Sequence, residues 1–192
     1  MNIDIRKLLM TAACMCAVVL MGAGTNTGSA ASSAKSVQAF AAMIPVLHDP
    51  RCMNCHSKGD YPRQGDDRKK HSMSVKRGAD GKGIAGAKCE SCHQDHNLAG
   101  VRTPPGAPDW HLPPTSTPMI WEGLTDGQLC RLMKDPRQNG GKNLGQLVEH
   151  FQTPLVKWGW HPGEGRRPIA ISYDDFMRDV RTWASQGAVC PD

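Results

Sequence analysis

Two short stretches of the chain combine thiols and an imidazole at a spacing suited to covalent haem binding. Each reads Cys-x-x-Cys-His, at residues 52–56 and again at residues 89–93. Thiols three positions apart lie on one side of a helical turn, where they can form thioethers with the vinyl groups of one porphyrin. The next residue places an imidazole nitrogen under the iron. The sequence therefore predicts two covalently attached haem c groups, held by Cys52, Cys55 and His56 and by Cys89, Cys92 and His93.

Paired cysteines can also build two other kinds of site. A zinc site would use the same four thiols as ligands, and a Cys-x-x-Cys pair in a thioredoxin-like fold would be a redox dithiol. Neither needs a histidine directly after the second cysteine in both pairs, and no βαβ pattern surrounds either motif. Haem explains the repeated pattern better than either alternative.

The sixth ligand of each iron decides between two kinds of chemistry. A filled position favours electron transfer, whereas an open position allows peroxide, nitrite or a gas to reach the metal. We favour His71, which a glycine-containing loop joins to the first motif, and His111, which proline-rich sequence fixes beside a tryptophan. The haem that each would serve stays open at this point. Other candidates are His48, His96, His150, His161 and the methionines, of which Met119 is best placed.

The first thirty residues have the order of a cleaved export signal. A basic start with Arg6 and Lys7 precedes an apolar stretch over residues 8–22, and small residues end at Ala30. The alternative is an uncleaved anchor, but the apolar stretch is shorter than the roughly 20 residues that span a bilayer. We expect cleavage after Ala30, a periplasmic product, and no transmembrane segment in the mature chain.

Cysteine usage agrees with export into an oxidising compartment. Two cysteines leave with the signal and four belong to the motifs, so the mature chain retains Cys130 and Cys190. We predict a disulfide between them, the alternative being two free buried thiols.

Composition limits both the core and the partners. The chain has 192 residues with 39% hydrophobic and 5% aromatic content, so two haems would supply much of the missing apolar surface of one domain. Removing residues 1–30 leaves 21 Lys and Arg against 17 Asp and Glu. Haem propionates could cancel this charge, so it does not argue for nucleic acid. The basic residues within 57–88 form either a solvated loop, a set of propionate partners or a docking face for an acidic redox protein.

Apolar spacing predicts a mainly α fold of short helices and long irregular loops wrapped around two haems, with little or no sheet. We expect a haem-binding part over residues 37–120 and a helical part over 121–192. We expect a disordered start at 31–36 and then a helix that begins at residue 37 and ends near Pro45 or at Asp49-Pro50. The segment 97–118 is extended and proline-rich, and we interpret it as a strap across a haem face.

Local signals place the later helices. One helix begins at the capping box of Thr125 and Gln128, and the next spans residues 144–151. An aromatic loop follows at 158–163. The last helix begins at Ser172 and ends at Gly187.

Several pieces of the chain resemble small exported dihaem c-type cytochromes. They are the two haem motifs and residues 77–81, 105–111 and 158–163. The resemblance implies a periplasmic electron carrier, and some members serve oxidoreductases such as molybdenum hydroxylases. We therefore expect a carrier that passes single electrons between redox partners, not an enzyme. A small peroxidase or nitrogen-oxide reductase with one open iron is the alternative, and a haem sensor is a weaker one.

Overall fold

A computed structural model describes residues 26–192, and their side chains from residue 28 onward. Most of the predicted export signal lies outside these residues. The described chain contains six α-helices and two hairpins of two-residue strands, which confirms a mainly α fold with little sheet. No helix in this part of the chain is long and apolar enough to cross a membrane.

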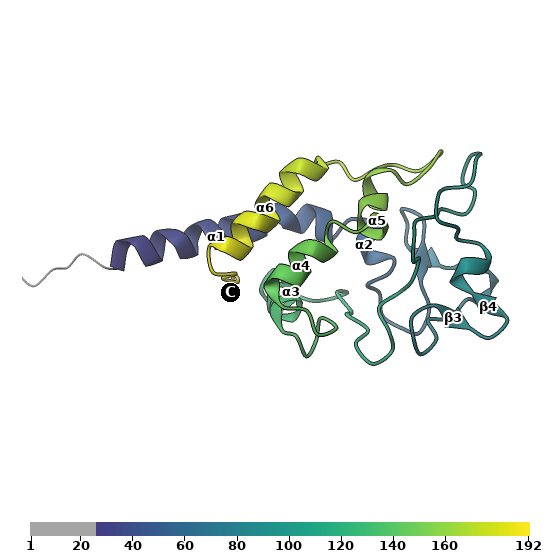
Figure 1. Cartoon of the computed structure of the whole chain (residues 1–192), viewed down its shortest axis with the longest axis horizontal. Helices are drawn as coiled ribbons and strands as arrows, with labels where there is room; N and C mark the ends of the chain where they lie inside the picture. Colours follow the sequence, from purple (N-terminus) through teal and green to yellow (C-terminus); the bar gives the residue numbers. More distant parts are fainter. Residues whose placement is uncertain (1–25) are drawn as a thin grey trace, which may run out of the picture.

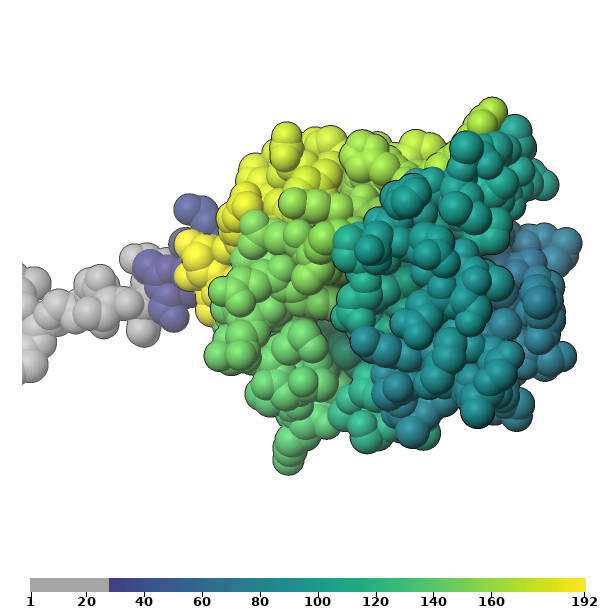
Figure 2. All heavy atoms as spheres, turned by 45° about the vertical axis from the view of Figure 1, so that its right-hand side comes forward, coloured from purple at the N-terminus to yellow at the C-terminus, as the bar shows by residue number. Residues whose placement is uncertain are grey.

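The molecule has two sides, which we call the helical lobe (residues 26–49 and 122–192) and the motif lobe (residues 50–121). In Figure 1 the helices of the helical lobe lie toward the N-terminal end, and the loops and small hairpins of the motif lobe lie at the other end. The space-filling view shows the same division, with green and yellow residues on one side and blue and teal residues on the other (Figure 2).

The helical lobe is built on two long helices that pack side by side, α1 (Asn26–Leu47) and α6 (Tyr173–Ser185) (Figure 1). Their buried faces meet at Phe40 and Trp183, whose ring centroids are 5.4 Å apart. The predicted cap of α6 is confirmed, because the Ser172 side chain accepts a hydrogen bond from the backbone N–H of Asp175.

Our expectation of disorder at residues 31–36 is wrong, because α1 already includes them. Ser36 is fully buried, and its hydroxyl donates to the carbonyl of Trp183 at 3.0 Å. The same hydroxyl accepts from the backbone N–H of Val189 at 2.9 Å. These partners are about 150 residues away in sequence, so local composition could not reveal them. Of the two predicted ends, the one near Pro45 is wrong, because the helix continues through this proline and ends at Leu47, just before Asp49 and Pro50.

Two shorter helices complete this lobe, and both begin where the sequence predicted. They are α3 (Asp126–Lys134) and α4 (Leu144–His150), each with a complete capping box. The predicted disulfide between Cys130 and Cys190 is confirmed, with Cα atoms 5.5 Å apart. It joins α3 to the segment after α6. The short helix α5 (Pro154–Lys157) precedes the predicted aromatic loop, whose first half is a helical turn, η4 (Trp158–Trp160), and whose second half is irregular.

The motif lobe consists of short elements joined by long loops. They are α2 (Pro50–Met53), β1 (Arg63–Gln64), β2 (Lys69–Lys70), η2 (Ser72–Ser74), β3 (Gly83–Ile84), β4 (Ala87–Lys88) and η3 (Cys89–Ser91). Both hairpins are antiparallel. Residues 97–121, which we call the strap, contain no helix or strand. Between residues 54 and 118 the only buried apolar side chains are Cys89, Ala107 and Leu112.

Candidate haem-binding site

The first motif lies on α2 and the turn that follows it. Asp49 caps this helix by accepting from the backbone N–H of Arg51 at 2.9 Å, and Pro50 occupies its first turn. The backbone N–H groups of Cys55 and His56 both donate to the carbonyl of Cys52 at 3.2 Å. The two thiols therefore belong to one helical turn. Burial raises the pKa of Cys55 to about 11 and that of Cys52 further, so both thiols are neutral.

The second motif repeats this backbone geometry on η3. The N–H groups of Cys92 and His93 donate to the carbonyl of Cys89 at 3.2 and 2.9 Å. Its surroundings differ, because Cys89 is buried but Cys92 is exposed to solvent. The two motifs thus share a local shape, and the second lies nearer the surface.

Each motif histidine has its Nδ1 fixed by a backbone carbonyl from the strap. The distance is 3.0 Å from His56 to the oxygen of Met119 and 2.7 Å from His93 to the oxygen of Pro105. A carbonyl can only accept, so Nδ1 carries the proton in both rings and Nε2 is the nitrogen available to a metal. A hydrogen bond on the second nitrogen is what orients most metal-binding histidines in proteins.

Each of these rings also stacks face to face on a tryptophan of the strap. His56 lies 3.7 Å from Trp121 with ring planes 4° apart, and His93 lies 4.6 Å from Trp110 with planes 2° apart. Trp158 packs edge-on against Trp110. Trp110 is the tryptophan next to His111 in sequence, yet it packs against the imidazole of His93. The strap therefore supplies both a carbonyl and an indole to each histidine.

Burial also keeps these imidazoles neutral. It lowers the pKa of His56 to about 3, although the bond to Met119 acts in the opposite direction. The pKa of His93 is lowered in the same way, mainly by burial and against the bond to Pro105. The neutral ring is the form that binds a metal.

His71 lies close to His93, and the separation of the two rings matches the distance that one shared metal would require. Their ring centroids are 6.1 Å apart, with planes inclined by 62°. An imidazole nitrogen binds a transition metal at about 2 Å and the centroid lies about 1 Å behind that nitrogen, so two rings on opposite sides of one metal have centroids roughly 6 Å apart. The Nδ1 of His71 donates to the carbonyl of Ser72 at 2.8 Å, which leaves Nε2 for a metal. Although chain proximity linked His71 to the first motif, it faces the second.

The structure links His111 to a motif histidine less clearly than it links His71 to His93. Its Nδ1 donates to the carbonyl of Asp109 at 2.5 Å, which again leaves Nε2 for a metal. It lines the same cavity as His71. Among the described residues, no imidazole faces His56 in the way that His71 faces His93.

The other candidate ligands differ in how near they lie to the motif histidines. Met119 gives its carbonyl to His56, so its backbone lies on the proximal side of that ring. His96 is exposed. His150 of α4 was not favoured from sequence, yet it is half-buried and its charge would act on His56. Burial, Lys142 and His111 lower the pKa of His150 to about 4.

A single cavity of about 850 Å³ joins the two motifs. Cys55 of the first motif lines it, as do Cys89, Cys92 and His93 of the second, with His71 and His111. This volume lies within the range of about 300–1,000 Å³ that is usual for cofactor sites. Apolar side chains such as Trp110, Leu112 and Trp158 line the cavity beside the thiols, which suits a bulky apolar cofactor.

The donor set also fits haem better than a bare metal ion. Within residues 26–192, no three His, Cys, Asp or Glu side chains converge as a metal site. A structural zinc needs four protein ligands, whereas a haem iron needs only two because the porphyrin supplies the other four donors. The residues present therefore suit an iron porphyrin.

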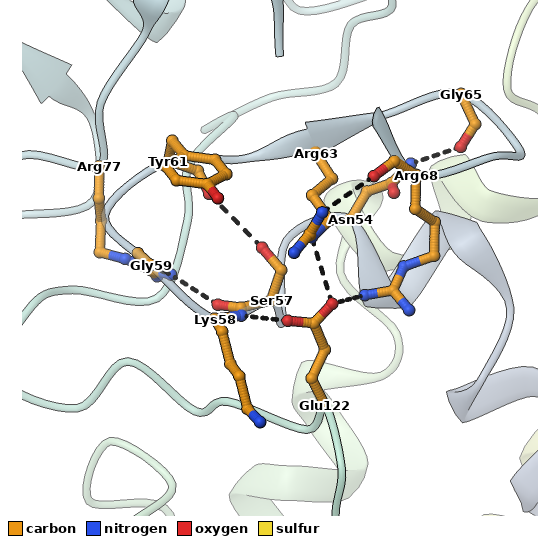
Figure 3. Close-up of polar contacts among 10 residues, drawn as sticks. All are labelled: Asn54, Ser57, Lys58, Gly59, Tyr61, Arg63, Gly65, Arg68, Arg77 and Glu122. Atoms are coloured by element: carbon orange, nitrogen blue, oxygen red, sulfur yellow. Dashed lines mark hydrogen bonds and ion pairs between the residues drawn. The ribbon is translucent and has the colours of Figure 1, made fainter. Parts of the chain in front are cut away.

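Glu122 ties together the loops that carry these groups, and sequence reasoning missed it. Its carboxylate accepts from the backbone N–H of Lys58 at 2.6 Å and pairs with Arg63 at 3.2 Å and with Arg68 (Figure 3). Both arginines belong to the β1–β2 hairpin, whose second strand leads directly to His71. Burial alone would raise the pKa of Glu122, but the Lys58 bond and the two arginines outweigh it and lower this pKa.

Comparisons of the chain with protein-family models, with curated proteins and with solved structures found no match. The argument for function therefore depends on the geometry of the site.

Proposed function

We propose that this chain is a dihaem c-type electron carrier of the small exported cytochrome class. Haem c groups attach at Cys52 and Cys55 and at Cys89 and Cys92, with His56 and His93 as the proximal ligands. When bound, the haems supply reversible one-electron chemistry between ferric and ferrous iron. The carrier passes single electrons between redox proteins of the periplasm, and its partner could be an exported oxidoreductase.

The observation that carries this proposal is the closeness of His71 and His93. Two imidazoles whose Nδ1 atoms are both occupied by backbone carbonyls, with 6.1 Å between ring centroids, suit the two axial positions of a six-coordinate iron. A six-coordinate iron gives substrates no access and favours outer-sphere electron transfer.

The chain's own residues do the remaining work of a carrier. The carbonyls of Pro105 and Met119 hold the proximal rings in one tautomer, and the two strap tryptophans fix the planes of those rings. A ligand set that does not move between oxidation states needs little rearrangement when an electron arrives. A cavity lined by both motifs would hold the two haems close together, which suits a short electron path.

The sixth position of the iron in the first motif distinguishes a carrier from an enzyme. We propose His111 as its sixth ligand, with His150 as the rival that the structure brings near His56. If neither binds, that iron is open and the chain is a small peroxidase or nitrogen-oxide reductase.

Absorption and EPR spectra of the purified oxidised protein test the proposal. We expect two covalently attached haems, both low-spin. His71→Gly should open one site and give a high-spin signal from half of the haem, and His111→Gly should do the same for the other half. His96→Gly, at an exposed position, is the matched control and should leave both irons low-spin.

Two results would contradict parts of this proposal. A high-spin haem that binds cyanide quickly in the unmodified protein would favour the enzyme. Low-spin spectra after His111→Gly would assign the ligand to another residue such as His150, while the carrier function would stand.

The export part of the proposal has its own test. Cleavage after Ala30 would leave most of α1 in place, including Ser36 and its two hydrogen bonds to the α6 region. We expect N-terminal sequencing of the periplasmic protein to begin at Ala31. Recovery of an intact chain from the membrane fraction would contradict cleavage.

A further inference from the structure

A buried cation lies beside the first motif. The Arg77 side chain is 2% exposed and is among the largest fully buried side chains of the described chain. Its guanidinium donates to the carbonyl of Pro113 at 2.5 Å and to those of Ser57 and Gly59 at 3.5 Å. Figure 3 shows Arg77 directed at this loop, and Ser57 is the residue directly after His56.

The charge of Arg77 has no carboxylate partner within 4 Å in the described part of the chain. Asp60 acts on Arg77 only from a greater distance, and it pairs with Lys76 at 3.0 Å. Backbone carbonyls satisfy the N–H groups of Arg77 but carry no net charge, and an arginine does not deprotonate in proteins. A net positive charge is thus retained in a region of low dielectric, where it acts more strongly than at the surface.

The charge of Arg77 lies beside the first motif, because its guanidinium donates to the carbonyl of Ser57 next to His56. It lowers the pKa of Cys55 and of His56, although burial is the larger influence on each. The second motif has a counterpart in Arg166, which acts on His93 and is only half-buried. Solvent therefore screens Arg166 more than Arg77.

We infer that the buried cation of Arg77 raises the reduction potential of the iron held by His56 above that of the iron held by His93. This inference rests on the proposed dihaem carrier. Reduction adds one negative charge to a haem, so a nearby unscreened cation stabilises the ferrous form. The exposed second motif would then exchange electrons with a partner, and the haem of the first motif would retain them.

Redox potentiometry of the full dihaem protein tests this inference. Arg77→Gln should lower the reduction equilibrium constant of one haem at least tenfold, which is about 59 mV for one electron, and leave the other less changed. Arg77→Lys, which keeps the charge, should restore most of the loss. Arg166→Gln is the matched control and should give a smaller shift.

A second variant assigns the two potentials to their haems and does not depend on Arg77. Replacing an imidazole by a thioether raises a haem potential, so His71→Met should move the potential of the iron at His93. We expect the wave that moves to be the lower of the two in the unmodified protein. If Arg77→Gln does not accumulate as a folded protein, this assignment and Arg77→Lys still decide the question.

The inference is overturned by any of three results. They are an equal shift of both haems in Arg77→Gln, an equal loss in Arg77→Gln and Arg77→Lys, or a His71→Met variant that moves the higher potential. Mass spectrometry of the purified protein keeps this separate from the parent proposal: absence of two covalent haems would refute the carrier itself.

Discussion

The two lobes of the molecule are held together by different means. In the helical lobe, Phe40, Val180 and Trp183 are fully buried against one another across α1 and α6. In the motif lobe, residues 54–118 bury only three apolar side chains, and buried contacts such as those of Arg77 are polar. The helical lobe therefore has an apolar core, which also includes Met53 and Trp121 from the ends of the motif lobe, whereas residues 54–118 lack apolar surface that a cofactor would supply.

Charge divides the lobes in the same way. Residues 50–121 carry 11 Lys and Arg against 7 Asp and Glu, whereas the helical lobe (residues 26–49 and 122–192) carries 10 of each. The net positive charge of residues 26–192 thus belongs to the motif lobe. The propionates of bound haem would reduce this positive charge. Haem would therefore supply the missing apolar surface of the motif lobe and also balance its excess charge.

The largest expected effect comes from removing the attachment thiols. In a variant with alanine at all four motif cysteines, we expect amides of residues 57–118 to lose protection from hydrogen exchange. Those of α1 and α6 should retain protection, because their packing is apolar and independent of haem. Hydrogen exchange with mass spectrometry measures both lobes at once. Equal protection or equal loss in the two lobes would contradict the idea that only the motif lobe depends on haem for its packing.

A smaller effect, limited to the helical lobe, is expected when the disulfide is removed. Replacing Cys130 and Cys190 together by serine should lower the free energy of unfolding of the helical lobe by about 2–4 kcal/mol. The haem spectra should not change, because the bond lies outside the motif lobe. Denaturant unfolding is followed by circular dichroism, which reports on the helical lobe, and by haem absorption, which reports on the motif lobe. A change in the spectra of the folded variant would show that the lobes are coupled.

The buried hydroxyl between α1 and the C-terminal segment should contribute less. Ser36→Ala leaves the N–H of Val189 without its partner, at a cost of about 1–3 kcal/mol. Gln38→Ala, at an exposed position on the same helix, is the control and should change stability by less than about 0.5 kcal/mol. Chemical denaturation of both variants measures the difference. Equal effects would mean that the hydrogen bonds of Ser36 contribute little.

The smallest effect is expected at Glu122 and depends on pH. Glu122→Gln should cost about 1 kcal/mol or less at pH 7, because the pairs it breaks are partly exposed. Folding lowers the pKa of this carboxyl, so its contribution is complete above the unfolded value of about 4.3 and disappears as pH falls through the folded value. Stability curves of the two proteins should therefore converge in acid. Glu149→Gln, at an exposed position, should show no such convergence.

Local signals explain what the sequence could predict. The capping boxes at Thr125 and Asn143 satisfy helix N-termini with residues three positions away, so they can be recognised without knowing the fold. The disulfide followed from counting cysteines. The start of α1 could not be predicted, because Ser36 is held by residues near the C-terminus.

The site was predictable only in part for the same reason. Chain spacing selected His71 as a ligand candidate, but its position opposite His93 depends on a hairpin anchored by Glu122. The stacking of Trp121 and Trp110 on the two imidazoles likewise depends on the path of a strap with no regular structure. No short-range pattern encodes such contacts. The one sequence signal is that a tryptophan of the strap lies a few residues after each carbonyl that binds a motif histidine.

The position of the strap in the chain sets an order of events. Residues 97–121 follow both thiol pairs, and they close over His56 and His93. A chain that crosses a membrane from its N-terminus presents both pairs before the covering segment has emerged. The enzymes that join haem to thiols would meet an uncovered substrate. Docking of the strap would then follow haem attachment, and the strap would cover the haems that had already been attached.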